Sequence, residues 1–141
     1  MSVVTHADQV TPAWLTRAFN AAGFSGAVKN VGWQRIGAGQ VGENARFELE
    51  CVGDIPSSVV GKFPSSDPTS KRMGVERNTY AREVFFYRTI AATIDTQTPV
   101  VFATEFDSDS CDFVVLMEDL APGIQVDQMS ECSLDQAAMA L

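Results

Sequence analysis

Hydrophobic and polar residues alternate along the stretch from Ala45 to Cys51. Its odd-numbered positions are apolar and its even-numbered positions are charged, with Ala45, Phe47, Leu49 and Cys51 on one face and Arg46, Glu48 and Glu50 on the other. A period of two residues predicts a strand with one buried face. Runs rich in β-branched and aromatic residues predict four more strands, at residues 28–36, 57–63, 100–106 and 111–117.

Helical periodicity marks the two ends of the chain. A helix is predicted to begin after Thr11, a suitable N-cap, with Pro12 at its first position, and to end near Gly23. Its apolar stripe predicts that it packs as an N-terminal brace for the residues that follow. Near the other end, Ser133 is placed to cap a helix that starts at Leu134.

One long helix is predicted in the middle of the chain, from about Val75 to Ile94, after a polar loop over residues 64–74. With about 100° per residue, its apolar face contains Tyr80, Phe86, Tyr87, Ile90, Ala91 and Ile94. The fifth strand, at residues 111–117, is apolar at nearly every position, which predicts a central place in a sheet. Strands and helices mixed in this way predict an α+β fold.

A glycine motif precedes the alternating strand. Gly37, Gly39 and Gly42 form the pattern Gly-x-Gly-x-x-Gly. In a dinucleotide-binding fold the third glycine opens a helix, whose N-terminus holds the pyrophosphate. Here a strand follows instead, which argues against an NAD-binding unit. Strand, glycine turn and strand is the arrangement of a flap that covers nucleotide phosphates. The alternative is a hairpin with a glycine-rich turn and no ligand.

A lysine and a glutamate stand at positions where burial is expensive. Lys62 lies within the apolar third strand, where a charge needs a partner unless the strand lies at an edge and the lysine points to solvent. Glu83 lies in the middle of the apolar face of the long helix. Glu76 is near the same line, but the helix dipole explains an acid in the first turn without a partner. We therefore expect Glu83 to pair with Lys62.

Composition limits the classes of function. The chain has 141 residues and a net charge of −8; all ten Lys and Arg occur up to Arg88, and ten Asp and Glu follow from Thr89 onward. This charge disfavours binding to nucleic acid or anionic membranes. The acidic part serves solubility, or it faces a cationic substrate or a basic partner. No apolar run is long enough for a membrane span, and the N-terminus has no signal-peptide core.

The cysteines and the histidine suggest no catalytic centre of their own. Cys51, Cys111 and Cys132 are odd in number and lack metal-type spacing, so we expect free thiols and a cytoplasmic location. His6, the single histidine, lies near the start of the chain, where we expect no catalytic role.

In this order the elements resemble the N-terminal lobe of the kinase-like fold. More narrowly, the chain resembles the small-molecule phosphotransferases: the aminoglycoside phosphotransferase, choline kinase and ecdysteroid-kinase-like group. Three stretches carry the resemblance, at residues 37–47, 80–87 and 114–120. It implies a five-stranded antiparallel sheet with one long packed helix. It also implies an N-terminal helical extension at residues 1–27, the lobe at 28–120, and a hinge with the start of a second lobe at 121–141.

The resemblance implies a role for each matching residue. The backbone N–H groups of Gly37, Gly39 and Gly42 would cover ATP phosphates, Lys62 would contact the α- and β-phosphates, and Glu83 would hold Lys62 in place. Met117 would be the gatekeeper behind the adenine, in a pocket shared with Ile36, Val60 and Leu120. The carbonyl group of Glu118 and the N–H group of Leu120 would bind the adenine edge.

Two residues depart from the protein-kinase pattern and two functional parts are missing. Asn44 replaces the usual valine after the third glycine, and Gly61 replaces the alanine before the lysine. The catalytic base and the ligands for Mg²⁺ are expected downstream of Leu141, because Asp127 and Asp135 lack the flanking His or Asn. We expect a longer parent that phosphorylates a hydroxyl group of a small molecule and a 141-residue chain that is inactive alone.

Two alternatives concern partners rather than chemistry. The face turned toward the missing half is a candidate surface for self-association. The alternative function is a small α+β binding or interaction module, in which Lys62 and Glu83 form a structural ion pair and no nucleotide binds.

Overall fold

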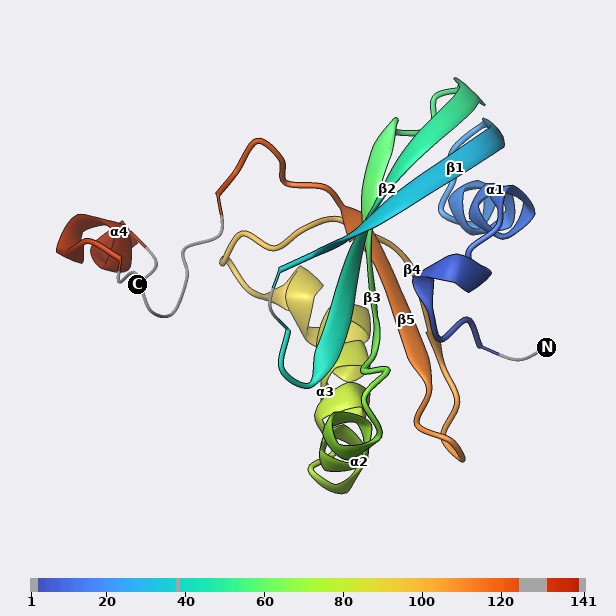
Figure 1. Cartoon of the computed structure of the whole chain (residues 1–141). Helices are drawn as coiled ribbons and strands as arrows, with labels where there is room; N and C mark the ends of the chain where they lie inside the picture. Colours follow the sequence, from blue (N-terminus) through green and yellow to red (C-terminus); the bar gives the residue numbers. More distant parts are fainter. Residues whose placement is uncertain (1–2, 38, 125–131, 140–141) are drawn as a thin grey trace.

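The computed structural model describes residues 3–37, 39–124 and 132–139, so Asp127 and Ala38 lie outside the described residues. Its centre is a five-stranded sheet with the order β1-β2-β3-β5-β4, in which every neighbouring pair is antiparallel (Figure 1). The strands are β1 (Gly26–Ile36), β2 (Gly42–Gly53), β3 (Ser58–Pro64), β4 (Val101–Phe106) and β5 (Phe113–Glu118). The α+β class and the antiparallel five-stranded sheet are therefore confirmed.

The alternation of β2 divides the sheet into two faces. Ala45, Phe47 and Leu49 are buried on the first face, whereas Glu48 is exposed on the second. Strand β5 lies between β3 and β4 and is buried from Phe113 to Met117, as predicted for a central strand. Its even-numbered residues contribute to the core on the first face, and its odd-numbered residues contribute to the core on the second.

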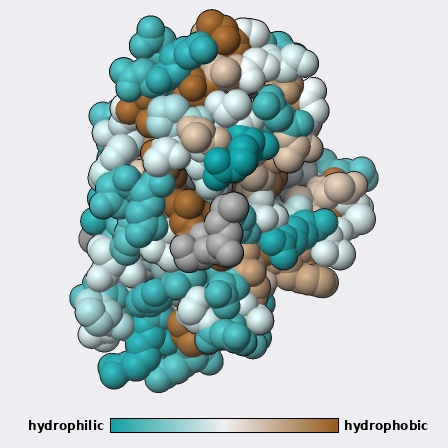
Figure 2. Space-filling view, turned by 90° about the vertical axis from the view of Figure 1, so that its right-hand side faces the viewer, coloured by the Kyte–Doolittle hydropathy of each residue, from teal (hydrophilic) through white to brown (hydrophobic). Residues whose placement is uncertain are grey.

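Helix α1 (Pro12–Ala21) covers the first face together with η1, a short 3-10 helix (Ala7–Gln9). The Thr11 side chain caps α1 by accepting a hydrogen bond from the N–H group of Trp14 (3.2 Å), as predicted. Trp14, Leu15 and Phe19 join the core formed by β2, β3 and β5. The outer surface on this side of the molecule is mostly hydrophilic, with hydrophobic groups in separate small areas (Figure 2).

The second face is covered by a broken helix, so the prediction of one long helix at residues 75–94 is wrong. Helix α2 (Pro68–Glu76) begins inside the predicted polar loop, because Asp67 accepts a hydrogen bond from the N–H group of Ser70 (2.7 Å) and Pro68 fits the first helical position. Asn78 then adopts a left-handed backbone with φ of 57°, which ends α2 and offsets the next helix.

Helix α3 (Thr79–Phe85) follows and leads into a π-helix η2 (Phe86–Ile90) and a 3-10 helix η3 (Ala91–Thr93). Tyr80 and Val84 of α3 are buried against Phe113, Val115 and Met117 of β5. Helices α1 and α3 therefore lie on opposite sides of the sheet (Figure 1). Six residues were predicted to form the apolar face of the long helix, and among them Tyr80 alone is fully buried. The α-helix gives way to a π-helix at Phe86, which turns the later side chains to directions other than those predicted.

Helix α4 (Leu134–Met139) begins where the sequence predicts it, and the Ser133 hydroxyl accepts a hydrogen bond from the N–H group of Gln136 (3.2 Å). Within the part of the chain that the structure describes, no helix has both the length and the apolar character needed to cross a bilayer.

Candidate functional site

A cavity of about 400 Å³ lies on the second face of the sheet. Its walls come from the start of the glycine turn, from the strands β1, β2 and β3, from η2 and from the segment that follows β5. Seven of the fifteen lining residues are ones named for the adenine and phosphate site: Ile36, Gly37, Val60, Lys62, Met117, Glu118 and Leu120. Residues far apart in the sequence thus meet around one space of the size that suits a small ligand.

The strands of the sheet form the floor of this cavity, and their register determines which side chains lie next to one another there. Val60 of β3 stands opposite Met117 of β5, and this pair gives the floor an apolar part. One step along the strands, Asn44 of β2 stands between Ile36 of β1 and Lys62 of β3. Across the three strands this row passes from the apolar side chain of Ile36 to the carboxamide of Asn44 and then to the ammonium group of Lys62.

Lys62 forms an ion pair with Glu83 of α3. Strand β3 lies between β2 and β5, so the alternative of an edge-strand lysine is wrong. The two side chains remain 28% and 23% exposed, which leaves the ammonium group open toward the cavity. Glu76 lies near the end of α2 and is not paired with Lys62, in agreement with the choice of Glu83.

Tyr87 of η2 lines the cavity beside this ion pair. Burial raises the pKa of its phenol, because a phenolate would lose solvation. The positive charge of Lys62 lowers this pKa and the negative charge of Glu83 raises it, and the pKa is raised overall. Tyr87 is therefore a neutral part of the cavity wall.

The glycine turn has a backbone that other residues would not adopt without strain. Gly37 has a φ of 69°, which favours glycine. A Cβ atom on Gly39 would collide with the carbonyl oxygen of Gly42, where β2 begins. Both glycines are thus required for the shape of the turn. Of the three glycines predicted to cover phosphates, Gly37 lines the cavity, whereas Gly39 and Gly42 do not.

Tyr80 holds the far end of this turn, a role that the sequence alone did not indicate. Its hydroxyl group donates to the carbonyl oxygen of Val41 (2.6 Å) and accepts from the N–H group of Ser65 (3.2 Å). The side chain is 1% exposed. A Cβ atom on Gly74 of α2 would overlap the tyrosine ring, so Gly74 gives the ring its space. The turn is therefore tied to α3 and to the end of β3.

Glu43 fixes the base of the turn from the first face. Its carboxylate accepts hydrogen bonds from the N–H and hydroxyl groups of Ser66 and pairs with Arg35 (3.6 Å). Burial raises the pKa of this carboxyl group, but the hydrogen bonds from Ser66 and the charge of Arg35 outweigh that effect and lower the pKa overall.

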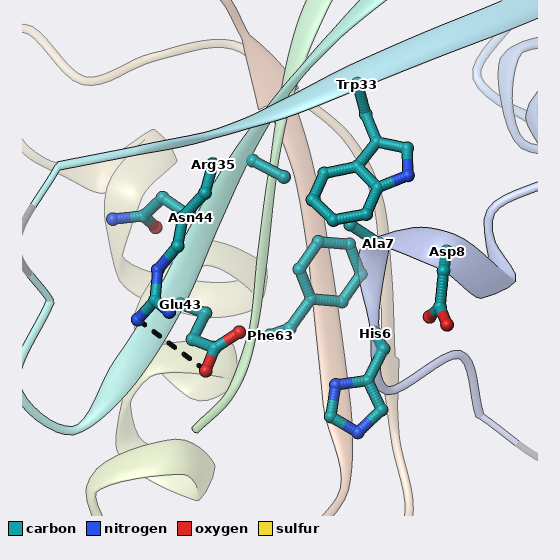
Figure 3. A pocket seen from close by; sticks show the side chains of 9 residues that line it. His6, Ala7, Asp8, Trp33, Arg35, Glu43, Asn44 and Phe63 are labelled. Carbon is teal, nitrogen blue, oxygen red and sulfur yellow. Dashed lines mark ion pairs between the residues drawn. The ribbon is translucent and has the colours of Figure 1, made fainter. Parts of the chain in front are cut away.

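A second cavity, of about 420 Å³, lies next to Glu43 on the first face, between Trp33 and Phe63 on one side and His6 and Asp8 on the other (Figure 3). Glu43 and Arg35 form their ion pair within this lining, and Lys62 is not part of it.

The proposed adenine wall is formed by β5 and the residues after it. Met117 is buried and borders the cavity. The Glu118 side chain accepts a hydrogen bond from the N–H group of Val100 (3.1 Å), and the Glu118 N–H group donates to the Val100 carbonyl oxygen (2.7 Å). Leu120 is 58% exposed at the rim. The end of β5 is thus fixed to the start of β4, while the rim stays open.

An ion pair between Arg46 and Asp119 crosses the cavity wall, and sequence reasoning missed it. The carboxylate of Asp119 accepts hydrogen bonds from Nε (2.8 Å) and Nη2 (3.0 Å) of Arg46, from the Ser58 hydroxyl and from the Ala121 N–H group (3.0 Å). The alternation of β2 placed Arg46 on the second face, so the position of one partner of this ion pair could be predicted. The contact of Asp119 depends on the turn after β5, which no spacing rule predicts.

The environment of Asp119 decides its protonation. The carboxylate is 6% exposed. Burial raises its pKa, but the hydrogen bonds from Arg46, Ser58 and Ala121 together with the charge of Arg46 have the larger effect and lower the pKa. Asp119 is therefore an ionised anchor for the segment after β5, with its oxygen atoms occupied.

The described residues contain no group of three or more His, Cys, Asp and Glu side chains placed to hold a metal ion. The arrangement can bind an anion through Lys62 and the turn N–H groups, and can bind a flat apolar group against Ile36, Val60 and Met117. No protein-family model and no curated protein sequence matches the chain, so the resemblance to small-molecule phosphotransferases stays a prediction from the motifs.

Proposed function

We propose that this chain is the nucleotide-binding lobe of an ATP-dependent phosphotransferase that phosphorylates a hydroxyl group of a small molecule. One observation carries the proposal: the Lys62–Glu83 ion pair stands at the wall of a cavity with an apolar floor, next to a glycine turn. A lysine held by a glutamate beside a glycine-rich turn is a suitable receptor for a chain of phosphates.

The shape and lining of the cavity fit a nucleotide. Its volume of about 400 Å³ lies in the range of small-ligand sites. The apolar side chains of Ile36, Val60 and Met117 offer a dry surface to a flat base. The ammonium group of Lys62 and the turn that begins at Gly37 offer donors to the phosphates.

Each residue then has one task. Lys62 donates to phosphate oxygen atoms, and Glu83 restricts the lysine to the rotamer that reaches them. The turn at residues 37–42 covers the phosphates, and Tyr80 keeps the turn in place through Val41. Arg46 and Asp119 fix the segment that forms the outer wall of the cavity.

General-base chemistry is not assigned to this cavity. Glu118 and Asp119 are the carboxylates that line it, and Asp119 already accepts four hydrogen bonds with a lowered pKa. Phosphoryl transfer depends on positioning together with neutralisation of charge by a metal. The described residues supply no cluster for a metal, so no step is assigned to Mg²⁺. The decisive measurement is therefore binding of ATP rather than turnover.

The test is a titration of the wild type and two variants with ATP, in which binding is measured by NMR chemical shifts and by calorimetry. We expect weak binding, with a Kd on the order of 1 mM, because one lobe leaves half of the nucleotide in water. Lys62→Met should weaken binding at least about tenfold. Lys71→Met is the matched control, because Lys71 also forms an ion pair, with Asp112 (2.6 Å), outside the cavity lining.

Shift changes at Ile36, Val60 and Met117 that saturate with ATP, and that disappear in Lys62→Met alone, would support the nucleotide site. The absence of binding at 10 mM ATP (about ten times the expected Kd), or equal binding by Lys62→Met and the wild type, would refute it. The ion pair would then be structural, as in a binding module without a nucleotide.

A further inference from the structure

Asn44 is one of the residues of the sheet that line the cavity, and the proposed function gives it no task. It stands opposite Ile36 on one side and opposite Lys62 on the other. Its amide points away from the rings of Trp33 and Phe63, which occupy the first face (Figure 3). The side chain therefore belongs to the face that contains Lys62 and lines the same cavity.

The Asn44 amide has an unmet hydrogen-bonding need. Its Oδ1 atom is buried and has no hydrogen-bond donor among the described residues. Its Nδ2 atom lies 4.0 Å from the position that a Cβ atom on Gly39 would take, so the amide is tucked against the glycine turn. A buried acceptor without a partner costs stability. The terminal torsion of asparagine is soft, so a small rotation can bring Oδ1 to a donor on a bound molecule.

Neighbouring groups narrow the chemistry of that donor. A phosphate oxygen atom is an acceptor, so it cannot satisfy Oδ1. A metal cation next to Asn44 would be repelled by the ammonium group of Lys62 on the adjacent strand. A neutral hydroxyl or N–H group remains. In a nucleotide the sugar hydroxyl groups are donors placed between the base and the phosphates, and Asn44 stands between Ile36, one of the apolar side chains of the lining, and Lys62.

We propose that Asn44 is a specificity-determining residue that accepts a hydrogen bond from a sugar hydroxyl group of the bound nucleotide. The inference rests on the proposed function, since it assumes a nucleotide in this cavity. A site built around a hydroxyl group rejects an analogue that lacks it, because the buried acceptor is then left unpaired. The cavity should therefore prefer a ribonucleotide to the corresponding deoxynucleotide.

The test compares ATP with 2′-deoxy-ATP and 3′-deoxy-ATP by NMR titration of the wild type. One of the two analogues should bind about tenfold more weakly than ATP. Asn44→Val should bind ATP as weakly as that analogue and should bind the analogue itself within about twofold of the wild type. Gln34→Val is the matched control, because Gln34 also carries an amide, pairs with Arg46 on the same face and lies outside the cavity lining. It should retain the preference.

A folding control accompanies each variant. Asn44→Val without nucleotide should unfold at the same urea concentration as the wild type or at a higher one, because it removes an unsatisfied buried acceptor. Asn44→Ser, which is too short to reach the ligand, provides a second variant with the same expected loss of preference.

The outcomes separate this inference from the proposed function. If the wild type binds ATP and both analogues equally, or if Asn44→Val and Asn44→Ser keep the preference, Asn44 has no such role while the nucleotide site stands. If no nucleotide binds to the wild type, both proposals are refuted.

Discussion

The hydroxyl group of Tyr80 offers a sharp test of how the glycine turn is held. Tyr80→Phe removes one oxygen atom and retains the ring, which packs against Phe113 with a centroid distance of 4.9 Å. The change deletes the hydrogen bonds to the Val41 carbonyl oxygen and from the Ser65 N–H group without creating a large cavity. The turn would then lose its direct tie to α3.

The magnitude follows from burial and from the number of bonds. Tyr80 is 1% exposed, and Ser65 is also buried, so its N–H group loses a partner that water does not easily replace. Two neutral hydrogen bonds of this kind contribute about 2 kcal/mol to the free energy of unfolding. For a chain of 141 residues this corresponds to a decrease in Tm of roughly 4–8 °C.

The assay is urea unfolding followed by tryptophan fluorescence, because Trp14 is buried in the core and reports on global unfolding. Hydrogen exchange of the backbone amides at residues 39–43 reports on the turn itself, and these amides should exchange faster in Tyr80→Phe. Tyr87→Phe is the matched control, because the Tyr87 hydroxyl group has no hydrogen-bond partner within the described residues and is less buried.

Equal unfolding midpoints for Tyr80→Phe and the wild type, together with unchanged exchange at residues 39–43, would refute the reasoning. A loss of stability as large in Tyr87→Phe as in Tyr80→Phe would also count against it, since the effect would then not depend on the bonds to Val41 and Ser65.

Two further substitutions test the wall and the floor of the site. Because the pKa of Asp119 is lowered in the folded state, its contribution to stability is fully present above the unfolded-state pKa of about 3.9 and is lost as the pH falls through the folded-state pKa. Asp119→Asn should therefore lower Tm at pH 7, and the difference in Tm from the wild type should shrink below about pH 4. A difference in Tm that stays constant from pH 7 to about pH 3 would contradict the assignment. In Gly61→Ala the new Cβ atom would lie 2.8 Å from Phe63 and 2.9 Å from Phe47, which should lower the free energy of unfolding measured in urea by about 1–3 kcal/mol. Gly32→Ala is the control, because a Cβ atom there has no neighbour within 4 Å, and it should leave the free energy of unfolding nearly unchanged. Equal effects of the two substitutions would contradict the packing argument.

Sequence patterns predicted the sheet well because each strand carries its own signal. The alternation from Ala45 to Cys51 and the apolar run at 111–117 depend on local composition, and both strands occur with the expected faces. The Lys62–Glu83 pair was also predictable, since each charge was out of place in its own element. A positive charge in an apolar strand and a negative charge on the apolar face of a helix that must pack on that strand predict that the two side chains pair.

The helical region was predicted less well because its break depends on the backbone of one residue. Asn78 tolerates the left-handed conformation, but asparagine also occurs within helices, so the apolar period seemed to continue through it. The cap formed by Asp67 and Pro68 was a readable signal that the polar composition of the loop obscured.

The contacts that fix the glycine turn and the outer wall of the cavity could not be predicted from spacing. Tyr80 had a sufficient role as a core residue, so nothing suggested that its hydroxyl group reaches Val41. Asp119 contacts Arg46 across 73 positions of sequence, and the contact requires both the register of β2 and the path of the chain after β5. Such contacts depend on tertiary geometry in which each partner looks ordinary by itself.

The two departures from the protein-kinase pattern have different physical explanations. Gly61 faces the core, where the rings of Phe47 and Phe63 pack edge to face at 6.2 Å and fill the space that an alanine methyl group would need. The glycine is thus compensated within the fold. Asn44, one position away across the β2–β3 pair, lies on the opposite face, and its buried Oδ1 atom finds no donor among the described residues. A departure that packing compensates needs no ligand, whereas one left unsatisfied at the cavity floor points to a ligand that supplies the missing donor.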